Sequence, residues 1–330
     1  MNTTTAVVTP RNGVAPARAK YMSLDNVRTG KLKQPLRILL HGVPGVGKSS
    51  FAAEAPKPVF LCADNGTSDL DVARLPEPRA WEDVLEAVRV LTEDDHPYET
   101  FVIDPLNWIE PMCWTAVCRE KGWSSIEEPG FMKGPTAAVD FWRALVARLE
   151  RLQATRRMHV ILLAHTAPRN FKNPEAEDFH RYQSGIDPLA AGLFQGWCDA
   201  VLFAKHETFT EKAGKQRARG RSTGVREMYT EWNAAFDAKN RFGLPAKLPL
   251  SWAEFHDGVE RYRSPDTKTR AAELRATIGK LLAAYGDEGY AAKANAYIGA
   301  AQDDVKRLDE IENRIAARLR AKQENEGEGA

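Results

Sequence analysis

Short apolar runs alternate with longer amphipathic stretches through the first half of this chain. The runs lie at 36–40, 59–62, 101–104 and 160–165. Between them, hydrophobic residues recur at helical spacing over 79–93 and 136–157, and 106–120 also favours a helix. Buried strands that alternate with helices predict an α/β domain, in which a mainly parallel sheet is flanked by helices.

The second half of the chain predicts a different kind of pairing. Residues 199–204 and 226–232 have the pattern of two strands joined as a hairpin, and 234–238 predicts one further strand. Apolar and aromatic residues continue for a short distance beyond these strands. We therefore expect the α/β core to extend over 35–262.

The two ends of the chain differ from this core in composition. Residues 1–34 combine threonines, prolines and basic side chains, and they predict a disordered basic arm. Residues 266–322 are rich in Ala, Lys, Arg and Glu and predict a small helical appendage, which suits interaction better than catalysis. Residues 323–330 predict a disordered acidic tail.

Composition and charge limit the class of protein. The chain has 330 residues, of which 43% are hydrophobic and 28% are charged, and its net charge is +1. Any nucleic-acid surface must therefore be local. The four cysteines lack metal-ligand spacing, which argues against a zinc site and favours reduced thiols. No apolar run has the length of a membrane helix, and we expect a cytoplasmic protein.

A phosphate-binding pattern, GxxxxGK[ST], begins at Gly42 and ends at Ser49. It follows a predicted strand and precedes a segment that can begin a helix, which is the context that such a loop needs. Glycines let backbone N–H groups converge on the β-phosphate, Lys48 reaches the β- and γ-oxygens, and Ser49 offers a hydroxyl to Mg²⁺. We expect ATP to be bound by Gly42, Pro44, Gly45, Val46, Gly47, Lys48, Ser49 and Ser50.

An acidic residue, Asp104, ends the third apolar run. This is the form of a Walker B strand, whose carboxylate holds the water shell of Mg²⁺ beside the phosphate-loop hydroxyl. Apolar strands that end in Asp are common. The α/β pattern and the position of this strand after the phosphate loop favour Asp104 and Ser49 as the magnesium ligands.

The fourth apolar run ends at His165, which places an imidazole at the sheet edge where ligands gather. This histidine is a candidate reader of the γ-phosphate, or it caps the strand. The segment 166–188 then mixes cations with aromatic residues, a combination that suits single-stranded nucleic acid because phosphates take the charges and bases stack on the rings. We interpret this segment as a nucleic-acid-binding loop or a mobile lid. Its candidate contacts are Arg169, Lys172 and Arg181.

The most basic stretch of the chain lies between the two predicted hairpin strands. Charge runs are usually solvated tips, yet few acidic residues offset this one, so a solvated tip and a nucleic-acid contact are both open. The cations in question are Lys212, Lys215, Arg217, Arg219 and Arg221.

Together these motifs resemble the RecA-like recombination ATPases, and most closely the short phage-encoded Sak-type ATPases of single-strand annealing and recombination. The resemblance covers roughly residues 36–255. Besides the phosphate loop and Asp104, two segments carry it. The run that ends at Asp64 resembles the RecA strand whose carboxylate activates the attacking water. Residues 238–241 resemble the element with which a RecA protomer reaches its neighbour's γ-phosphate.

This resemblance implies residue roles. Asp64 would orient or deprotonate water, His165 would sense the γ-phosphate, and Lys239 and Arg241 would complete the site of a neighbouring protomer. DNA would contact loops at 166–188 and 121–135.

The sequence also departs from the RecA pattern. Asp64 is one methylene shorter than the usual glutamate, which predicts weak catalysis. His165 replaces a glutamine with a titratable ring. The N-terminal residues lack an obvious oligomerisation helix, so filaments, rings and transient assemblies all remain open.

The sequence thus predicts an ATP- and Mg²⁺-dependent recombinase or annealing ATPase that binds single-stranded DNA and hydrolyses ATP as a homo-oligomer. Two alternatives remain: another DNA-acting P-loop ATPase, such as a helicase loader or packaging motor, and a non-catalytic partner protein switched by nucleotide. The helical appendage would meet a single-strand-binding protein or another recombination protein. A phage-encoded protein of this kind would work in the host cytoplasm.

Overall fold

The computed structural model describes residues 23–27, 31–64, 66–172, 177–211, 219–263, 267–302 and 304–327. The chain divides into two compact units, 1–32 and 33–330. Within the first unit, Leu24–Asn26 forms one turn of 3-10 helix. Most of the predicted basic arm lies outside the described residues.

The core is built on one sheet, and the strands around the phosphate loop are parallel. Its order is β10-β8-β7-β1-β5-β4-β2-β3, with β6 paired to β5 and β9 paired to β7. The strands β1, β2, β3, β4, β5 and β7 run in one direction. The strands β6, β8, β9 and β10 pair antiparallel with their neighbours. The bounds are β1 Arg37–Gly42, β2 Pro58–Cys62, β3 Ala73–Arg74, β4 Thr100–Asp104, β5 His159–Phe171, β6 Phe179–Ser184, β7 Ala200–Glu211, β8 Arg219–Tyr229, β9 Lys239–Asn240 and β10 Lys247–Pro249.

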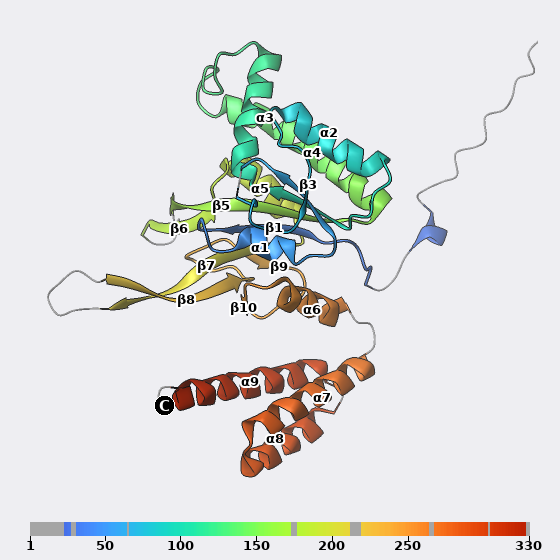
Figure 1. Cartoon of the computed structure of the whole chain (residues 1–330), viewed down its shortest axis with the longest axis vertical. Coiled ribbons are helices and arrows are strands. Elements are labelled where there is room, and N and C mark those ends of the chain that lie inside the picture. Colours follow the sequence, from blue (N-terminus) through green and yellow to red (C-terminus); the bar gives the residue numbers. More distant parts are fainter. Residues whose placement is uncertain are drawn as a thin grey trace, which may run out of the picture. The chain divides into compact units, whose positions relative to one another are not determined.

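Helices cover both faces of this sheet (Figure 1). The helices α2, α3 and α4 lie together over one face, and α6 lies over the other. The bounds are α1 Lys48–Ala53, α2 Trp81–Glu93, α3 Leu106–Lys121, α4 Lys133–Arg156, α5 Pro188–Trp197, α6 Trp252–Arg263, α7 Thr267–Tyr285, α8 Glu288–Ala301 and α9 Val305–Gly327. This arrangement confirms the predicted α/β fold class.

Neighbouring side chains of each buried strand pack on opposite faces of the sheet. Leu39 packs into the cluster that α2 to α5 cover, whereas its neighbours Ile38 and Leu40 pack into the cluster that contains Phe51 of α1 and Phe255 of α6. Successive side chains of a strand point to opposite faces, so a strand buried on both sides reads as a continuous apolar run. This is why the short apolar runs of the sequence are the central strands.

The segment 166–188 is more regular than the predicted loop. Residues 166–171 continue β5, and they pair antiparallel with β6 from Thr166–Ser184 to Phe171–Phe179. A short helix, α5, then begins at Pro188, where Asp187 caps its first turn by accepting a hydrogen bond from Leu189. The expectation of an irregular loop or lid is therefore wrong for the described residues of this segment. These polar and aromatic residues form a two-stranded hairpin. Because strands pair through backbone hydrogen bonds, the hairpin does not require an apolar periodicity in the sequence.

Two other predicted elements differ from the structure. Residues 234–238 contain no strand: a turn closed by the bridge between Asn233 and Phe236 lies there, and the strand β9 follows only at Lys239–Asn240. The Asn233 side chain accepts a hydrogen bond from the backbone of Ala235, which favours a turn over a strand. The helix predicted from residue 136 begins earlier, at Lys133.

The C-terminal residues form α7, α8 and α9, which share a hydrophobic cluster of their own. Leu274, Ile278, Leu308 and Ile315 are at its centre. The predicted tail begins too early, because α9 continues to Gly327 through a run of strong helix formers. No helix in the described part of the chain is long and apolar enough to cross a membrane.

Candidate nucleotide-binding site

The phosphate loop joins β1 to α1, and its backbone requires glycine. Gly45 and Gly47 have φ angles of 75° and 102°, in the left-handed region that L side chains rarely adopt. Gly42 lies so close to β7 that a Cβ atom there would collide with the carbonyl oxygen of Ala204. The loop can therefore turn tightly over the end of β1, which is the geometry that presents successive N–H groups to a phosphate.

Lys48 lies inside this loop rather than in solvent. Its side chain is buried, and its Nζ donates hydrogen bonds to the carbonyl oxygens of Gly42 and Val43 over 3.2 and 3.1 Å. Burial lowers the pKa of Lys48, while the charges of Asp104 and Asp64 raise it. The two hydrogen bonds hold the Lys48 side chain at the loop, where it can meet phosphate oxygens.

Ser49 and Asp104 meet across the sheet. The Ser49 hydroxyl donates a 2.6 Å hydrogen bond to Oδ2 of Asp104, although β5 separates β4 from β1, the strand that leads into the helix of Ser49. Burial raises the pKa of Asp104, and the nearby charge of Asp64 adds to that effect; the bond from Ser49 and the charge of Lys48 act in the opposite direction. A hydroxyl and a carboxylate in contact fit the pair that holds Mg²⁺ and its waters in a P-loop site.

These two side chains do not make a closed metal site. Across the described ranges, no group of three or more His, Cys, Asp or Glu side chains is placed to hold a metal ion. A divalent cation beside Ser49 and Asp104 would take its remaining ligands from phosphate oxygens and water, as Mg²⁺ usually does. The site therefore fits a metal that arrives with nucleotide.

Asp64 follows β2 at the same edge of the sheet. Strand β2 pairs in parallel with β4, in the register Cys62 to Asp104, so the two carboxylates follow neighbouring strand ends. The Asp64 Oδ1 accepts a 2.9 Å hydrogen bond from the backbone N–H of Gly66, which fixes this short side chain in the turn after the strand. The structure therefore brings Asp64 to the site, with one carboxylate oxygen committed to its own turn.

His165 lies beside the start of the phosphate loop. It pairs with Gly42 in the β1–β5 register, and its Nδ1 is buried without a hydrogen-bond partner among the described residues. Burial and the positive charge of Lys48 lower its pKa, so the imidazole is neutral at pH 7. The described part of the chain therefore leaves one ring nitrogen of His165 unpaired next to the phosphate loop.

Asn107, which the sequence patterns did not indicate, ties this histidine to the strand of Asp104. Its Oδ1 accepts a 2.7 Å hydrogen bond from the backbone N–H of His165. Gly185, which follows β6 at the same end of the β5–β6 hairpin, donates its N–H to the carbonyl oxygen of His165 and packs against the Asn107 amide. The base of the hairpin is thus fixed to residues that directly follow the Walker B strand.

Arg226 of β8 is a second residue that the patterns did not indicate. Its Nη1 lies 2.8 Å from the position that a Cβ atom on Gly47 would occupy, so the guanidinium lies against the phosphate loop. The sequence placed Arg226 only as the first residue of a predicted strand. Its approach to Gly47 depends on how β7, β8 and β1 pair, which local patterns do not specify.

Lys239 and Arg241 lie towards the amino ends of the parallel strands, away from the end that carries the phosphate loop. Lys239 pairs with Val201, which pairs with Leu39 near the start of β1, and the distance from there to the loop is roughly 10 Å along the strand. The Lys239 ammonium donates to the carbonyl oxygen of Gln195, and Arg241 forms a 3.2 Å ion pair with Asp199. Neither cation is brought to the phosphate loop of its own chain.

The predicted nucleic-acid contacts are dispersed. Arg169 donates to the carbonyl oxygen of Ile186, and Lys172 is exposed. The expectation for Arg181 is wrong in this structure, because its side chain is only 5% exposed and forms an ion pair with Asp237. Lys212, Lys215 and Arg217 lie outside the described residues, and Arg219 and Arg221 lie on β8 at positions whose side chains are not described.

Arg181 instead organises an aromatic surface. Its guanidinium lies 5.2 Å from the ring centre of Phe171 and 5.3 Å from that of Trp232. Trp232 is 64% exposed and Tyr182 is 40% exposed. Tyr182 lies on β6 itself, and Trp232 lies beside the hairpin through its contact with Arg181.

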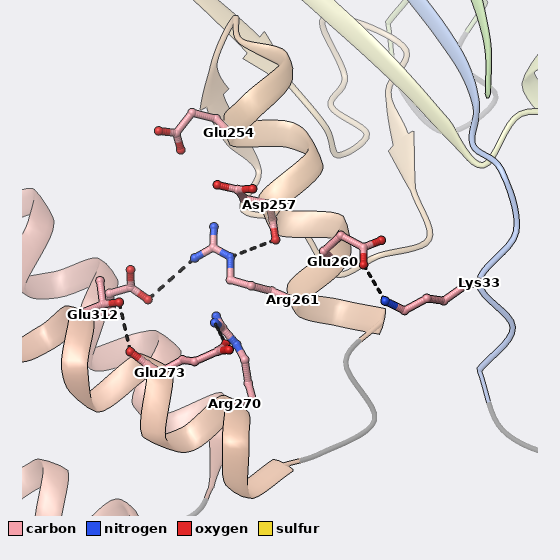
Figure 2. Close-up of a pocket in the computed structure, with 9 residues that line it drawn as sticks. Lys33, Glu254, Asp257, Glu260, Arg261, Arg270, Glu273 and Glu312 are labelled. Atoms are coloured by element: carbon pink, nitrogen blue, oxygen red, sulfur yellow. Dashed lines mark hydrogen bonds and ion pairs between the residues drawn. The ribbon is translucent and has the colours of Figure 1, made fainter. Parts of the chain in front are cut away.

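A separate cavity of about 600 Å³ is lined by charged side chains of α6, α7 and α9 (Figure 2). Its cations are paired with acids of the same lining: Arg261 lies 3.8 Å from Glu312, and Arg270 lies 3.6 Å from Glu273. These pairs leave acidic groups in excess in the lining. The cavity therefore does not fit an anionic nucleotide, and we place the candidate site at the phosphate loop.

The fold and the contact between Ser49 and Asp104 define the class of P-loop NTPases. A family described as an AAA domain matches residues 34–242, and the chain belongs to that family. Among curated proteins there is no match. The 143 matching chains of solved structures include the crystal structure of the RadB recombinase, at 9% identity and a TM-score of 0.38, over 64% of this chain and 84% of that one.

Proposed function

We propose that this protein is a RecA-like ATPase of the Sak type, which binds single-stranded DNA and hydrolyses ATP as a homo-oligomer during annealing or recombination. The observation that carries the proposal is the 2.6 Å bond between Ser49 and Asp104 across the intervening strand β5. His165, the last residue of β5 that pairs with β1, would then lie between the two motifs that we expect to hold Mg-ATP.

The residues at this edge supply separate parts of ATP hydrolysis. Lys48 and the N–H groups of the loop would bind the β- and γ-phosphates, and Ser49 and Asp104 would hold Mg²⁺, which neutralises the developing charge. Asp64 would orient the attacking water. Because one of its oxygens already accepts the N–H of Gly66, we expect hydrolysis by the isolated subunit to be slow.

DNA binding is supported by the path of β5. The strand continues without a break from His165 into the β5–β6 hairpin, and Asn107 contacts the base of that hairpin. The exposed ring of Tyr182 on this hairpin and that of Trp232 beside it offer aromatic surface for bases. A group that reads the γ-phosphate is therefore on the same element as the surface we assign to single-stranded DNA.

Action in trans is supported by the position of Lys239 and Arg241. They are too far along the sheet to serve their own phosphate loop, yet Arg241 is half-exposed. Cations that come from a neighbouring protomer would make hydrolysis depend on assembly, because phosphoryl transfer relies on charge neutralisation.

Steady-state ATP hydrolysis with and without single-stranded DNA tests this function. We expect DNA to stimulate turnover strongly, and Lys48→Ala to abolish it. Stimulation only by a helicase or a packaging partner would indicate another DNA-acting motor. ATP binding without turnover under all conditions would indicate a nucleotide switch, for which the helices α7 to α9 would bind the partner.

A further inference from the structure

Arg226 is an exposed arginine of β8, and its side chain lies against the phosphate loop rather than against an acidic side chain. Its Nη1, Cζ and Cδ atoms lie 2.8, 3.6 and 3.7 Å from the Cβ position of Gly47, so the length of the side chain follows the loop. Among the described residues, no carboxylate pairs with it. Its neighbours differ: Lys247 pairs with Glu227, and Lys205 lies over the ring of Tyr229.

The direction of Arg226 follows from the strands that carry it. Met228, two residues further along β8, is buried in the cluster on the α1 side of the sheet. Residues two apart in a strand face the same side, so Arg226 faces the side of α1 and its loop. Opposite it on β7 stands His206, two residues beyond Ala204, which pairs with Gly42. Arg226 is therefore level with the loop, about 7 Å past the end of β1.

The backbone next to Arg226 is held in place by β10. Leu248 and Pro249 of β10 pair with Met228 and Glu227. Glu227 is buried, and it accepts the hydroxyl of Tyr229 over 2.7 Å and pairs with Lys247. These contacts fix the backbone from which the Arg226 side chain extends, so its starting point relative to the loop is set by the sheet.

A guanidinium at this place suits phosphate. Arginine presents several N–H donors in a planar fork that matches phosphate oxygens, and it keeps its charge at every physiological pH. Lys48 already places one positive charge in the same loop. A second cation against the loop, without an acid of its own, is electrostatically unfavourable until an anion binds between the two.

We propose that Arg226 binds the phosphates of the nucleotide in cis, as a second cationic arm of the phosphate loop that the sequence motif does not contain. This inference rests on the proposed nucleotide site and adds the strand β8 to it. Because β8 also carries the described end of the basic hairpin, nucleotide binding would fix the inner end of that hairpin against the loop.

Equilibrium binding of ATP, ADP and adenosine to the full chain tests the proposal. Arg226→Ala should weaken ATP and ADP binding about tenfold or more, which is typical of a lost charged hydrogen bond, and leave adenosine binding unchanged. Arg226→Lys should recover part of the loss, because the charge returns without the fork. Arg151→Ala removes an equally exposed arginine from α4 and should change nothing.

The outcomes separate this inference from the nucleotide site itself. If Arg226→Ala binds ATP like the native protein while Lys48→Ala does not, Arg226 is no part of the site and the proposal is wrong. If Lys48→Ala also binds normally, the nucleotide site is wrong. A loss of ATP, ADP and adenosine binding together, with a lower melting temperature of the free protein, would mean that Arg226 acts on the fold and would overturn the proposal.

Discussion

The hydroxyl of Ser49 donates a 2.6 Å hydrogen bond to the carboxylate of Asp104, although β1, which leads into the helix of Ser49, and β4, which ends at Asp104, are not neighbours. Strand β5 lies between them, and its pairing with β1 ends at His165. Helix α1 and the strands β5 and β4 therefore bring a hydroxyl, an imidazole and a carboxylate to one end of the sheet. This arrangement leads to separate predictions for each group.

Asp104→Asn should uncouple ATP binding from Mg²⁺. The amide keeps the shape of the side chain and can still accept the Ser49 hydroxyl, but it lacks the charge that holds the metal and its waters. We expect turnover with Mg²⁺ to fall by about 100-fold, in the range seen when one group that stabilises the transition state is removed. ATP binding in the presence of EDTA should change little.

Two results would contradict this role of Asp104. Turnover equal to that of the native protein would show that the carboxylate does not hold the metal. A loss of ATP binding in EDTA would show that Asp104 supports the loop rather than the cation.

His165→Gln should preserve ATP hydrolysis better than His165→Ala. Because burial and Lys48 lower the pKa of His165, its neutral ring acts as a hydrogen-bonding group at pH 7, and an amide can replace it. We expect turnover of the Gln variant within a few-fold of native, and about a tenfold or larger loss in the Ala variant. The measurement is DNA-stimulated turnover from pH 6.5 to 8.5.

The pH profile decides between a neutral and a charged histidine. A neutral ring predicts parallel profiles for the native protein and the Gln variant. If native turnover fell as the pH rose through 7, while turnover of the Gln variant stayed constant, the imidazolium would be the active form, contrary to this account.

Glu110 should make stability depend on pH. Its carboxylate is buried in α3, where it accepts a 2.7 Å hydrogen bond from the N–H of Asp187. Burial raises its pKa from 4.5 to about 7, and the charge of Asp187 adds to this effect. The folded protein therefore keeps a proton that the unfolded chain loses between pH 4.5 and 7, and the free energy of unfolding falls as pH rises through that window.

Glu110→Gln removes this titration and keeps an acceptor for Asp187. Compared with the native protein, the variant should gain stability from pH 5 to pH 8, by up to about 3 kcal/mol from the shift in pKa. Chemical denaturation at several pH values measures the gain, with the exposed Glu127→Gln as the control. Parallel stability profiles for native and Glu110→Gln proteins would rule out a buried, titrating Glu110.

Trp232→Ala should weaken binding of single-stranded DNA. The exposed ring beside the β5–β6 hairpin offers a stacking surface, and one stacked base is worth about 1–3 kcal/mol, or roughly five- to hundredfold in affinity. Tyr297→Ala removes an exposed ring from α8 and serves as the control. Fluorescence anisotropy with an oligonucleotide measures both. Equal DNA affinity for Trp232→Ala and native protein would remove this surface from the proposal.

Local sequence specified the central strands and the phosphate loop. Leu39 and Leu40 are both apolar because the sheet is covered on both faces, and the glycines of the loop are required by its own backbone. Such signals depend on a residue and its near neighbours, and they can be read without knowing the rest of the fold.

Pairings between distant segments could not be predicted in the same way. Arg181 looks like a nucleic-acid contact in the sequence, but Asp237 approaches it only after the turn at 233–236 forms. Arg226 reaches Gly47 only because β8 pairs with β7, which pairs with β1. Register and long-range ion pairs are set by the whole sheet, and a charged residue alone does not reveal whether it is solvated, paired or aimed at a ligand.

The central claim is that Lys239 and Arg241 of one protomer complete the ATP site of its neighbour. ATP hydrolysis by mixed variants on single-stranded DNA tests this claim most directly. The account predicts that Lys48→Ala and the double variant Lys239→Ala/Arg241→Ala are each nearly inactive, and that mixing them restores part of the native turnover. Each variant must first match the stability of the native protein. Absence of rescue at every mixing ratio would contradict the account.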